Sequence, residues 1–224
     1  MKKLIILIVG ISFFYGCKKS DSGGGGAIAE SYLNTSTGSS WSYHETNRSS
    51  GTPQNSDYTL TSTSKDTSIN SKSYHIYTFS YGGSQYLAHN VHDYYQYDSI
   101  PGALGQIFER LYLRDNTNTN ASWSQQILIP IPGLPVSIPV DIDNMIIEKG
   151  LTKVINGITY KNVIHVSTTI SSSAIPSASL TSDIHSYYAP NYGLINNNTI
   201  VHLDYAGVKQ DVNIATSLIS ASLK

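Results

Sequence analysis

The sequence predicts an all-β domain: a curved antiparallel sheet, as a half-open β-barrel or a sandwich, with about eleven short strands and little helix. Three observations predict this class. The chain has 17 Tyr against 4 Phe and 2 Trp, and Tyr favours pleated, half-buried strands. Asn, Ser and Gly, which are typical of turns, are abundant between the apolar stretches. No long stretch shows the 3.6-residue apolar period of an amphipathic helix.

Alternation of apolar and polar residues predicts the strands of the first half. Trp41 and Tyr43 alternate with polar residues, and a turn follows at residues 51–53. Residues 85–97 are expected to form one strand with a bend, and residues 106–114 a strand, with a short helix as the alternative. The other strands expected in this half cover residues 58–62, 73–81 and 123–129.

Turn signals divide the second half in the same way. Asn156-Gly157 predicts a hairpin, because Asn-Gly between alternating segments is the best short hairpin signal. Further turns are expected at Gly150 and at Ala206-Gly207. The strands expected around these turns cover residues 144–149, 152–155, 158–161, 163–170, 183–189, 199–205, 208–214 and 216–223.

Residues 127–140 (ILIPIPGLPVSIPV) form one of the most apolar stretches of the chain and contain four prolines. Proline cannot donate to a sheet ladder, so the pattern excludes a central strand and favours an extended, polyproline-like or edge segment. We expect this segment to pack as a loop over one end of the barrel, or to form a lid over an apolar cavity or a partner contact. The candidate ligand-binding residues are Ile129, Ile131, Leu134, Val136 and Ile138.

A short apolar run near the N-terminus precedes the single cysteine of the chain. Lys2 and Lys3 supply positive charge, residues 4–15 are apolar, and Gly16 is the small residue before Cys17. A run of about 12 residues is too short to span a bilayer and has the length of a signal-peptide core. We expect residues 1–16 to be a lipoprotein signal peptide and Cys17 to be lipidated. An ordinary secretory peptide with a chance cysteine is the alternative.

The mature chain is expected to be a tether followed by one domain. Residues 17–26 begin with the lipidated cysteine and end in four glycines, a composition typical of a flexible spacer. Residues 27–224 suffice for a single domain with a sizeable core. The anchor predicts a place in the cell envelope, at the outer membrane.

Composition also excludes several classes of function. The chain has 14 Lys+Arg against 15 Asp+Glu, so there is no basic footprint for nucleic acid. With Cys17 acylated, no thiol remains for a disulfide, a thiolate metal site or a nucleophile. Neither a Gly-x-Ser-x-Gly elbow nor a Gly-rich phosphate loop occurs. We therefore expect neither an enzyme nor a cofactor.

Two sets of side chains invite a metal-binding interpretation. Asp141 and Asp143 would share a face of a strand and offer oxygen ligands to calcium. Their spacing lacks the glycine and glutamate of a known calcium loop, which favours solvated turn residues instead. His89 and His92 point to opposite faces of a straight strand, which favours two exposed histidines over a shared site.

Four features recur in one order along residues 32–205. Tyr32 precedes Gly38-Ser39-Ser40-Trp41-Ser42-Tyr43, residues 156–163 (NGITYKNV) follow, and residues 187–195 (YYAPNYGLI) come before a terminal hairpin. This resembles a group of lipoproteins from Bacteroidetes-type bacteria that open with a Gly-x-x-Trp-x-Tyr strand and carry a late Tyr-x-Ala-x-x-x-Gly-Leu-Val element. Those proteins look similar in turn to the half-open barrels of Lol-type lipoprotein carriers, whose curved sheet wraps an apolar cavity.

The resemblance and the apolar segment together imply a membrane-anchored envelope protein. We expect it to bind an apolar or amphipathic small molecule or lipid in the concave face of the sheet. The alternative is a structural module that binds an envelope protein or a glycan through exposed tyrosines. An unfilled cavity would favour the first and a solid core the second.

Overall fold

The computed structural model describes residues 30–99, 107–130, 137–205 and 207–224. These residues contain strands, turns and loops but no helix, and thus no helix able to cross a membrane. The twelve strands are β1 (Ser40–Asn47), β2 (Gln54–Ile69), β3 (Lys72–Phe79), β4 (Ser84–Asn90), β5 (Asp93–Ser99), β6 (Ile107–Arg114), β7 (Ser122–Pro130), β8 (Ser137–Ile155), β9 (Ile158–Ser171), β10 (Leu180–Ala189), β11 (Gly193–Tyr205) and β12 (Val208–Ser222). The all-β class and the antiparallel sheet are as the sequence predicts.

All twelve strands belong to one antiparallel sheet with the order β6-β5-β4-β3-β2-β1-β12-β11-β10-β9-β8-β7. Every strand lies beside its neighbours in sequence, except that β6 and β7 are not adjacent. The first strand pairs with the last, β1 with β12, so the two ends of the described chain meet in the middle of the sheet. The edges of the sheet are therefore β6 and β7, which are consecutive in sequence.

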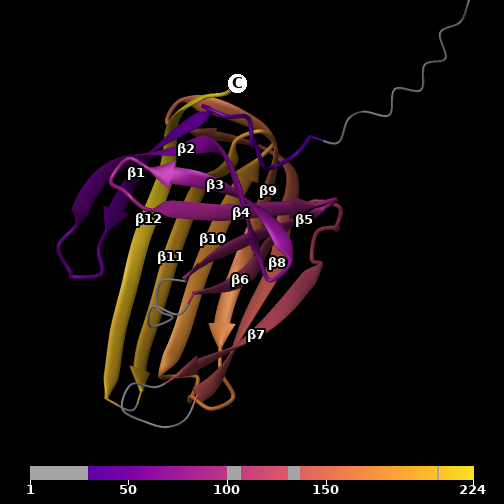
Figure 1. Ribbon diagram of the computed structural model, residues 1–224. Helices are drawn as coiled ribbons and strands as arrows, with labels where there is room; N and C mark the ends of the chain where they lie inside the picture. The colour runs from indigo at the N-terminus through magenta and orange to yellow at the C-terminus, as the bar shows by residue number, and fades with distance from the viewer. Residues whose placement is uncertain (1–29, 100–106, 131–136, 206) are drawn as a thin grey trace, which may run out of the picture.

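The sheet curls into a barrel whose two edges approach each other. In Figure 1 the long strands β8–β12 run along the molecule, and β3–β6 cross in front of them. At the seam, side chains of β7 bond to the backbone of β6. The indole Nε1 of Trp123 donates to the carbonyl of Leu111 at 2.8 Å, and the amide of Gln125 donates to the carbonyl of Glu109. Side chains thus join the edges here.

Several predicted strands are parts of longer ones. The predicted turn at Gly150 is wrong, because Gly150 lies inside β8 with a positive φ of 75°. The register between β8 and β9 shifts three times between Ile146 and Lys153, so Gly150 belongs to a bulged stretch. Conversely, residues 85–97 form two strands, because Val91, with φ of 57°, lies in a tight turn between β4 and β5.

The described ends of the proline-rich segment are strands. Residues 127–130 end β7, an edge strand, and residues 137–140 begin β8. Pro139 pairs with Leu128 of β7, and pairing of β8 with β9 begins only at Asp141. Pro130 and Pro139 therefore each lie where one side of the strand needs no donor, which is how a sheet tolerates proline. Residues 131–136 lie outside the described residues.

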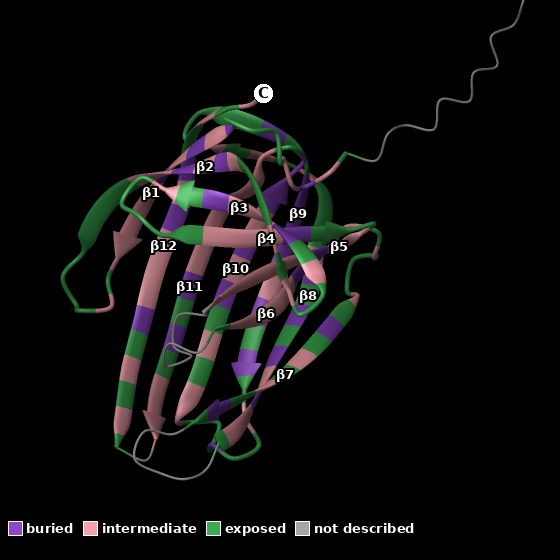
Figure 2. Ribbon diagram, viewed as in Figure 1, coloured by how far each residue is buried: buried purple, intermediate pink, exposed green. Residues whose placement is uncertain are grey.

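Three clusters of buried side chains fill the barrel. One joins Tyr32 and strands β5 and β6 to β7–β10, and a second joins β1–β3 to β9–β12. The third is aliphatic and lies on β7–β12. Figure 2 shows buried and exposed positions alternating along β11 and β12, as expected for strands with one inner and one outer face.

Candidate functional site

A cavity of about 440 Å³ lies inside the barrel. Its lining comes from residues 32–34, from the inner faces of β1–β6, from the hairpin turns after β3 and β10, and from β10–β12. The volume falls in the range of small-molecule sites, roughly 300–1,000 Å³. The cavity is therefore the leading candidate for a binding site in the described part of the chain.

Strand alternation places aromatic rings on this inner face. On β1, Trp41 and Tyr43 line the cavity, and on β3, Tyr77 and Phe79 do so, followed by Tyr81 in the turn. The residues between them point outward. The sequence predicts the Trp41–Tyr43 alternation, and the fold turns that face inward.

Four of the rings form a continuous surface from the interior to the rim. Tyr43 stacks on Tyr58 with ring centroids 5.3 Å apart, and Phe79 stacks on Tyr81 at 5.0 Å. Tyr58 meets both rings of the second pair at 5.8 Å and steep angles. Tyr43 is buried, whereas Tyr81 is 70% exposed. A ligand entering past Tyr81 would meet an aromatic surface along its path.

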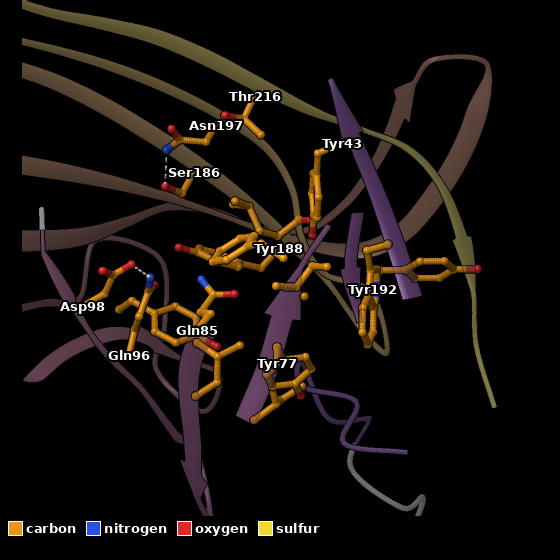
Figure 3. Close-up of a pocket in the computed structure, with 18 of the residues that line it drawn as sticks. Tyr43, Tyr77, Gln85, Gln96, Asp98, Ser186, Tyr188, Tyr192, Asn197 and Thr216 are labelled. Carbon is orange, nitrogen blue, oxygen red and sulfur yellow. Dashed lines mark hydrogen bonds between the residues drawn. The ribbon is translucent and has the colours of Figure 1, made fainter. Parts of the chain in front are cut away.

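Polar side chains are interspersed among these rings. Asn197 donates through its amide to the Ser186 hydroxyl at 2.9 Å, and Thr199 donates to the Asn197 carbonyl oxygen at 2.8 Å. Figure 3 shows the Ser186–Asn197 bond on the wall of the cavity. The amides and hydroxyls of the lining are those of Asn34, Gln85, Gln96, Ser186, Asn197, Thr199 and Thr216.

Charged groups enter the lining from β1, β5 and β6. The Arg110 guanidinium donates to the Gln96 carbonyl oxygen at 2.9 Å, and the Gln96 amide donates to Asp98 at 3.1 Å. The second of these bonds is drawn in Figure 3. On the β1 side, burial raises the pKa of Glu45. The cavity therefore carries charge at its wall.

Burial also governs the tyrosines. It raises the pKa of Tyr43 and Tyr112 well above the usual range. It raises the pKa of Tyr188 as well, and the positive charge of Arg110 offsets part of that rise. These phenols remain neutral at physiological pH, so they offer hydroxyl groups and apolar rings.

The segment before β1 covers one end of the cavity. Tyr32 donates through its hydroxyl to the carbonyl of Asn162 at 2.6 Å, and Tyr77 donates to the carbonyl of Asn34 at 2.7 Å. These bonds join the start of the described chain to β3 and β9. The segment that follows the predicted tether is thus part of the cavity wall.

The predicted apolar flap contributes no described residue to this lining. Ile129 is buried in the aliphatic cluster on β7–β12, and Ile138 packs against that cluster. Ile131, Leu134 and Val136 lie outside the described residues. The cavity that the structure does contain is lined instead by β1–β6 and β10–β12.

Asp141 and Asp143 lie within strand β8, not in a turn as expected. Gln126 donates to Asp141 at 2.8 Å, and the Ser124 hydroxyl donates to Asp143. These are cross-strand pairs between β7 and β8. Across the described ranges, no group of three or more His, Cys, Asp or Glu residues is placed to hold a metal.

The remaining predicted positions are placed as follows. His92 bonds to Asp115 at 2.6 Å, and His89 stacks on Tyr94 with ring centroids 4.4 Å apart. The two histidines thus have separate partners. Cys17 lies outside the described residues.

The sequence analysis missed Arg110. Phe108, Arg110 and Tyr112 alternate along β6, and all three turn inward, Phe108 against the aliphatic cluster and the others into the cavity. Arg114 continues the same alternation and does not line the cavity, so the sequence pattern by itself does not single out Arg110. Arg110 indicates a site only when the structure shows that its face of β6 lines the cavity.

Comparisons with known proteins find similar folds only. No protein-family model matches the chain, and curated proteins yield no match. A "putative lipoprotein" from Parabacteroides distasonis matches with 14% identity and a TM-score of 0.45. A "putative exported protein with YmcC-like fold" from Bacteroides fragilis matches with 10% identity and a TM-score of 0.42. Each comparison covers 85% of this chain and 98% of the other.

Proposed function

We propose that this protein is a lipid-anchored, non-enzymatic protein of the outer membrane that binds an amphipathic small molecule inside its barrel. The observation that carries the proposal is the cavity of about 440 Å³ between the two halves of the sheet. Side chains in close-packed interiors leave few voids larger than a water molecule, so a space of this size is a feature to be explained.

The lining favours an amphipathic occupant over a purely apolar one. Aromatic rings from β1, β2 and β3 offer apolar faces, while amides and hydroxyls from β4, β5, β10 and β11 lie beside them. Several of these groups bond to one another, but a plain hydrocarbon would still cover their remaining donors and acceptors without replacing their contacts with water, which costs free energy. A molecule with an apolar body and polar substituents satisfies both kinds of wall.

The anchor is supported by the leader sequence. Residues 4–15 have the length of a signal-peptide core, and Cys17 follows directly after Gly16. Residues 18–26 would span about 15–18 Å as a flexible coil. The described domain begins shortly afterwards, at Glu30. Such a tether would hold the barrel near the membrane while leaving the cavity free to exchange its ligand.

Native mass spectrometry of the complete protein, purified from its own membranes in mild detergent, tests both parts. We expect a mass shift at Cys17 equal to a diacylglyceryl group with or without an N-acyl chain, lost in a Cys17→Ser variant. We also expect a bound small molecule released on denaturation and identified by extraction. A mature chain without acyl mass would contradict the anchor, and a clean apo mass would contradict the ligand.

A structural module that contacts an envelope protein or a glycan is the second candidate. The observation that favours it is Tyr81, which is 70% exposed and stacks on Phe79 at the rim of the cavity. A Tyr81→Ala variant separates the two functions. Loss of partner cross-linking with unchanged ligand occupancy supports the module, whereas loss of ligand alone places Tyr81 in the cavity entrance.

A further inference from the structure

Arg110 supplies a positive charge to the cavity lining and has no counter-ion among the described residues. Within the described ranges, no Asp or Glu oxygen forms an ion pair with its guanidinium. By contrast, Arg114 on the same strand pairs with Asp93 at 3.2 Å. Arg110 is half-buried, and a partly buried cation gains most from a partner of opposite charge.

Among the described residues, Arg110 uses only a small part of its hydrogen-bond capacity. A guanidinium has five N–H donors in a planar fork that matches carboxylate and phosphate groups. In the described part of the chain, one of these donors is engaged, by Gln96 at 2.9 Å. Among the described residues, no other hydrogen bond engages the remaining donors, which face the cavity lining.

Gln96 separates Arg110 from the nearest acidic residue on this wall. Its carbonyl oxygen accepts from Arg110, and its NH₂ group donates to Asp98. The orientation of this amide is therefore set from both sides. The Gln96 amide therefore bridges Arg110 and Asp98 through one hydrogen bond to each.

The surroundings of Arg110 are apolar on the side facing β10. Tyr112 and Tyr188 are both buried, with ring centroids 5.3 Å apart, and both sense the charge of Arg110. Leu87 and Gln96 are cross-strand neighbours and both line the cavity, so Leu87 adds an aliphatic side chain beside the Arg110–Gln96 pair. An anionic group placed here would form charge-assisted hydrogen bonds with the guanidinium beside apolar side chains.

We propose that the ligand of the cavity carries one anionic group, a carboxylate or a phosphate- or sulfonate-like oxyanion, which binds Arg110. Its apolar body lies against the Tyr112 and Tyr188 rings and the aromatic surface that leads to the rim. This inference rests on the proposed function, because it assumes that the cavity binds a ligand. Beyond the proposed function, the inference specifies that the ligand is anionic and that its charged group lies at Arg110, with its apolar body directed toward the rim.

Two fluorescent probes with the same ring skeleton test the charge directly. N-phenyl-1-naphthylamine is neutral, and 8-anilinonaphthalene-1-sulfonate is the same molecule with one sulfonate. Their dissociation constants are measured for the mature chain from residue 18 onward, which contains every described residue. In Arg110→Gln we expect sulfonate affinity to fall at least tenfold and affinity for the neutral probe to change less than threefold.

Two further variants serve as controls. Arg110→Lys retains the charge and should retain sulfonate affinity within about threefold to fivefold, since lysine lacks only the fork geometry. Arg114→Gln removes an arginine of the same strand outside the cavity and should leave both affinities unchanged. Equal losses in Arg114→Gln and Arg110→Gln would overturn the inference, because they would indicate a general surface charge effect.

A measurement on the unchanged protein covers the case in which Arg110→Gln does not fold. Decanoate and 1-decanol are compared as competitors of the bound sulfonate probe, and inorganic phosphate is added alone. We expect decanoate to displace the sulfonate probe at a lower concentration than 1-decanol does. Phosphate alone should not displace the probe at either concentration. Displacement of the probe by phosphate alone would identify a site for free anions and would overturn the inference that the ligand is amphipathic.

The possible failures are distinguishable. If neither probe binds the unchanged protein, the proposed function fails and the inference fails with it. If both probes bind and Arg110→Gln affects both alike or neither, the cavity binds ligands but Arg110 does not select their charge. A selective loss of the anionic probe supports the inference.

Discussion

Two histidines on neighbouring strands illustrate how single residues acquire properties from the fold. His165 lies 3.2 Å from Glu148 through Nδ1 and 2.8 Å from His185 through Nε2, and His185 reaches Asp183 at 2.9 Å. The side chain of His165 is 8% exposed. Burial lowers the pKa of His165, although its hydrogen bond to the Glu148 carboxylate acts in the opposite direction. A neutral His165 donates to Glu148 and accepts from His185.

The pH dependence of stability should reveal His165. Because its folded-state pKa is lowered, its contribution is present above the unfolded value, about 6.5, and is lost as pH falls below it. We expect the melting temperature to drop between pH 7.5 and pH 5.0, and to drop less in His165→Gln. His89→Gln is the control and should show the full drop. An identical drop in His165→Gln would contradict the assignment.

At the scale of elements, the seam between β6 and β7 depends on side chains. The Trp123 indole and the Gln125 amide donate to carbonyl groups of β6, where backbone pairing between the two edge strands is absent in the described residues. An unpaired edge is otherwise open to pairing with another chain. These two side chains thus both stabilise the barrel and cover its edge.

The two tryptophans provide a matched test of the seam. Trp123 donates to the Leu111 carbonyl, whereas the buried Nε1 of Trp41 has no acceptor in the described part of the chain. Replacing either with Phe removes similar apolar area, but Trp123→Phe also breaks a hydrogen bond. We expect Trp123→Phe to lower the free energy of unfolding by about 1 kcal/mol more than Trp41→Phe in urea titrations. Equal losses would show that the indole bond adds nothing.

At the scale of the whole molecule, the barrel has a tyrosine-rich interior. Burial raises the pKa of Tyr32 to about 12, and it raises the pKa of Tyr58 and Tyr77 beyond that. A phenol with a raised folded-state pKa contributes stability below its unfolded value, about 10, and loses it as pH rises further. The barrel is therefore expected to be alkali-labile above that pH.

Absorbance at 295 nm, which reports phenolate, should show this behaviour. In the folded protein we expect only part of the tyrosines to ionise near pH 10, and the rest to ionise together with unfolding at higher pH. In denaturant, all of them should ionise near pH 10. A single transition near pH 10 in the folded protein would contradict the buried positions of these rings.

Local patterns predicted several elements correctly. The Asn156-Gly157 hairpin is confirmed, with φ of 48° and 81° at its two residues, as a tight hairpin turn requires. The inner face of β1 follows from the alternation of Trp41 and Tyr43. The turn predicted at Gly150 is wrong because a bulge inside a long strand uses the same positive φ as a turn. The two differ in whether the residues before and after the glycine pair with the same neighbouring strand, as they do here with β9.

Sequence by itself determined the all-β class, the alternation that gives each strand two faces, and the turns, because these depend on neighbours a few residues apart. Only the tertiary structure decided that β1 pairs with β12, that side chains join β6 to β7, and that Arg110 lines the cavity. Those outcomes join residues up to 182 positions apart, such as Ser40 and Ser222. They follow from how twist and bulges curl the whole sheet, which no local window of sequence contains.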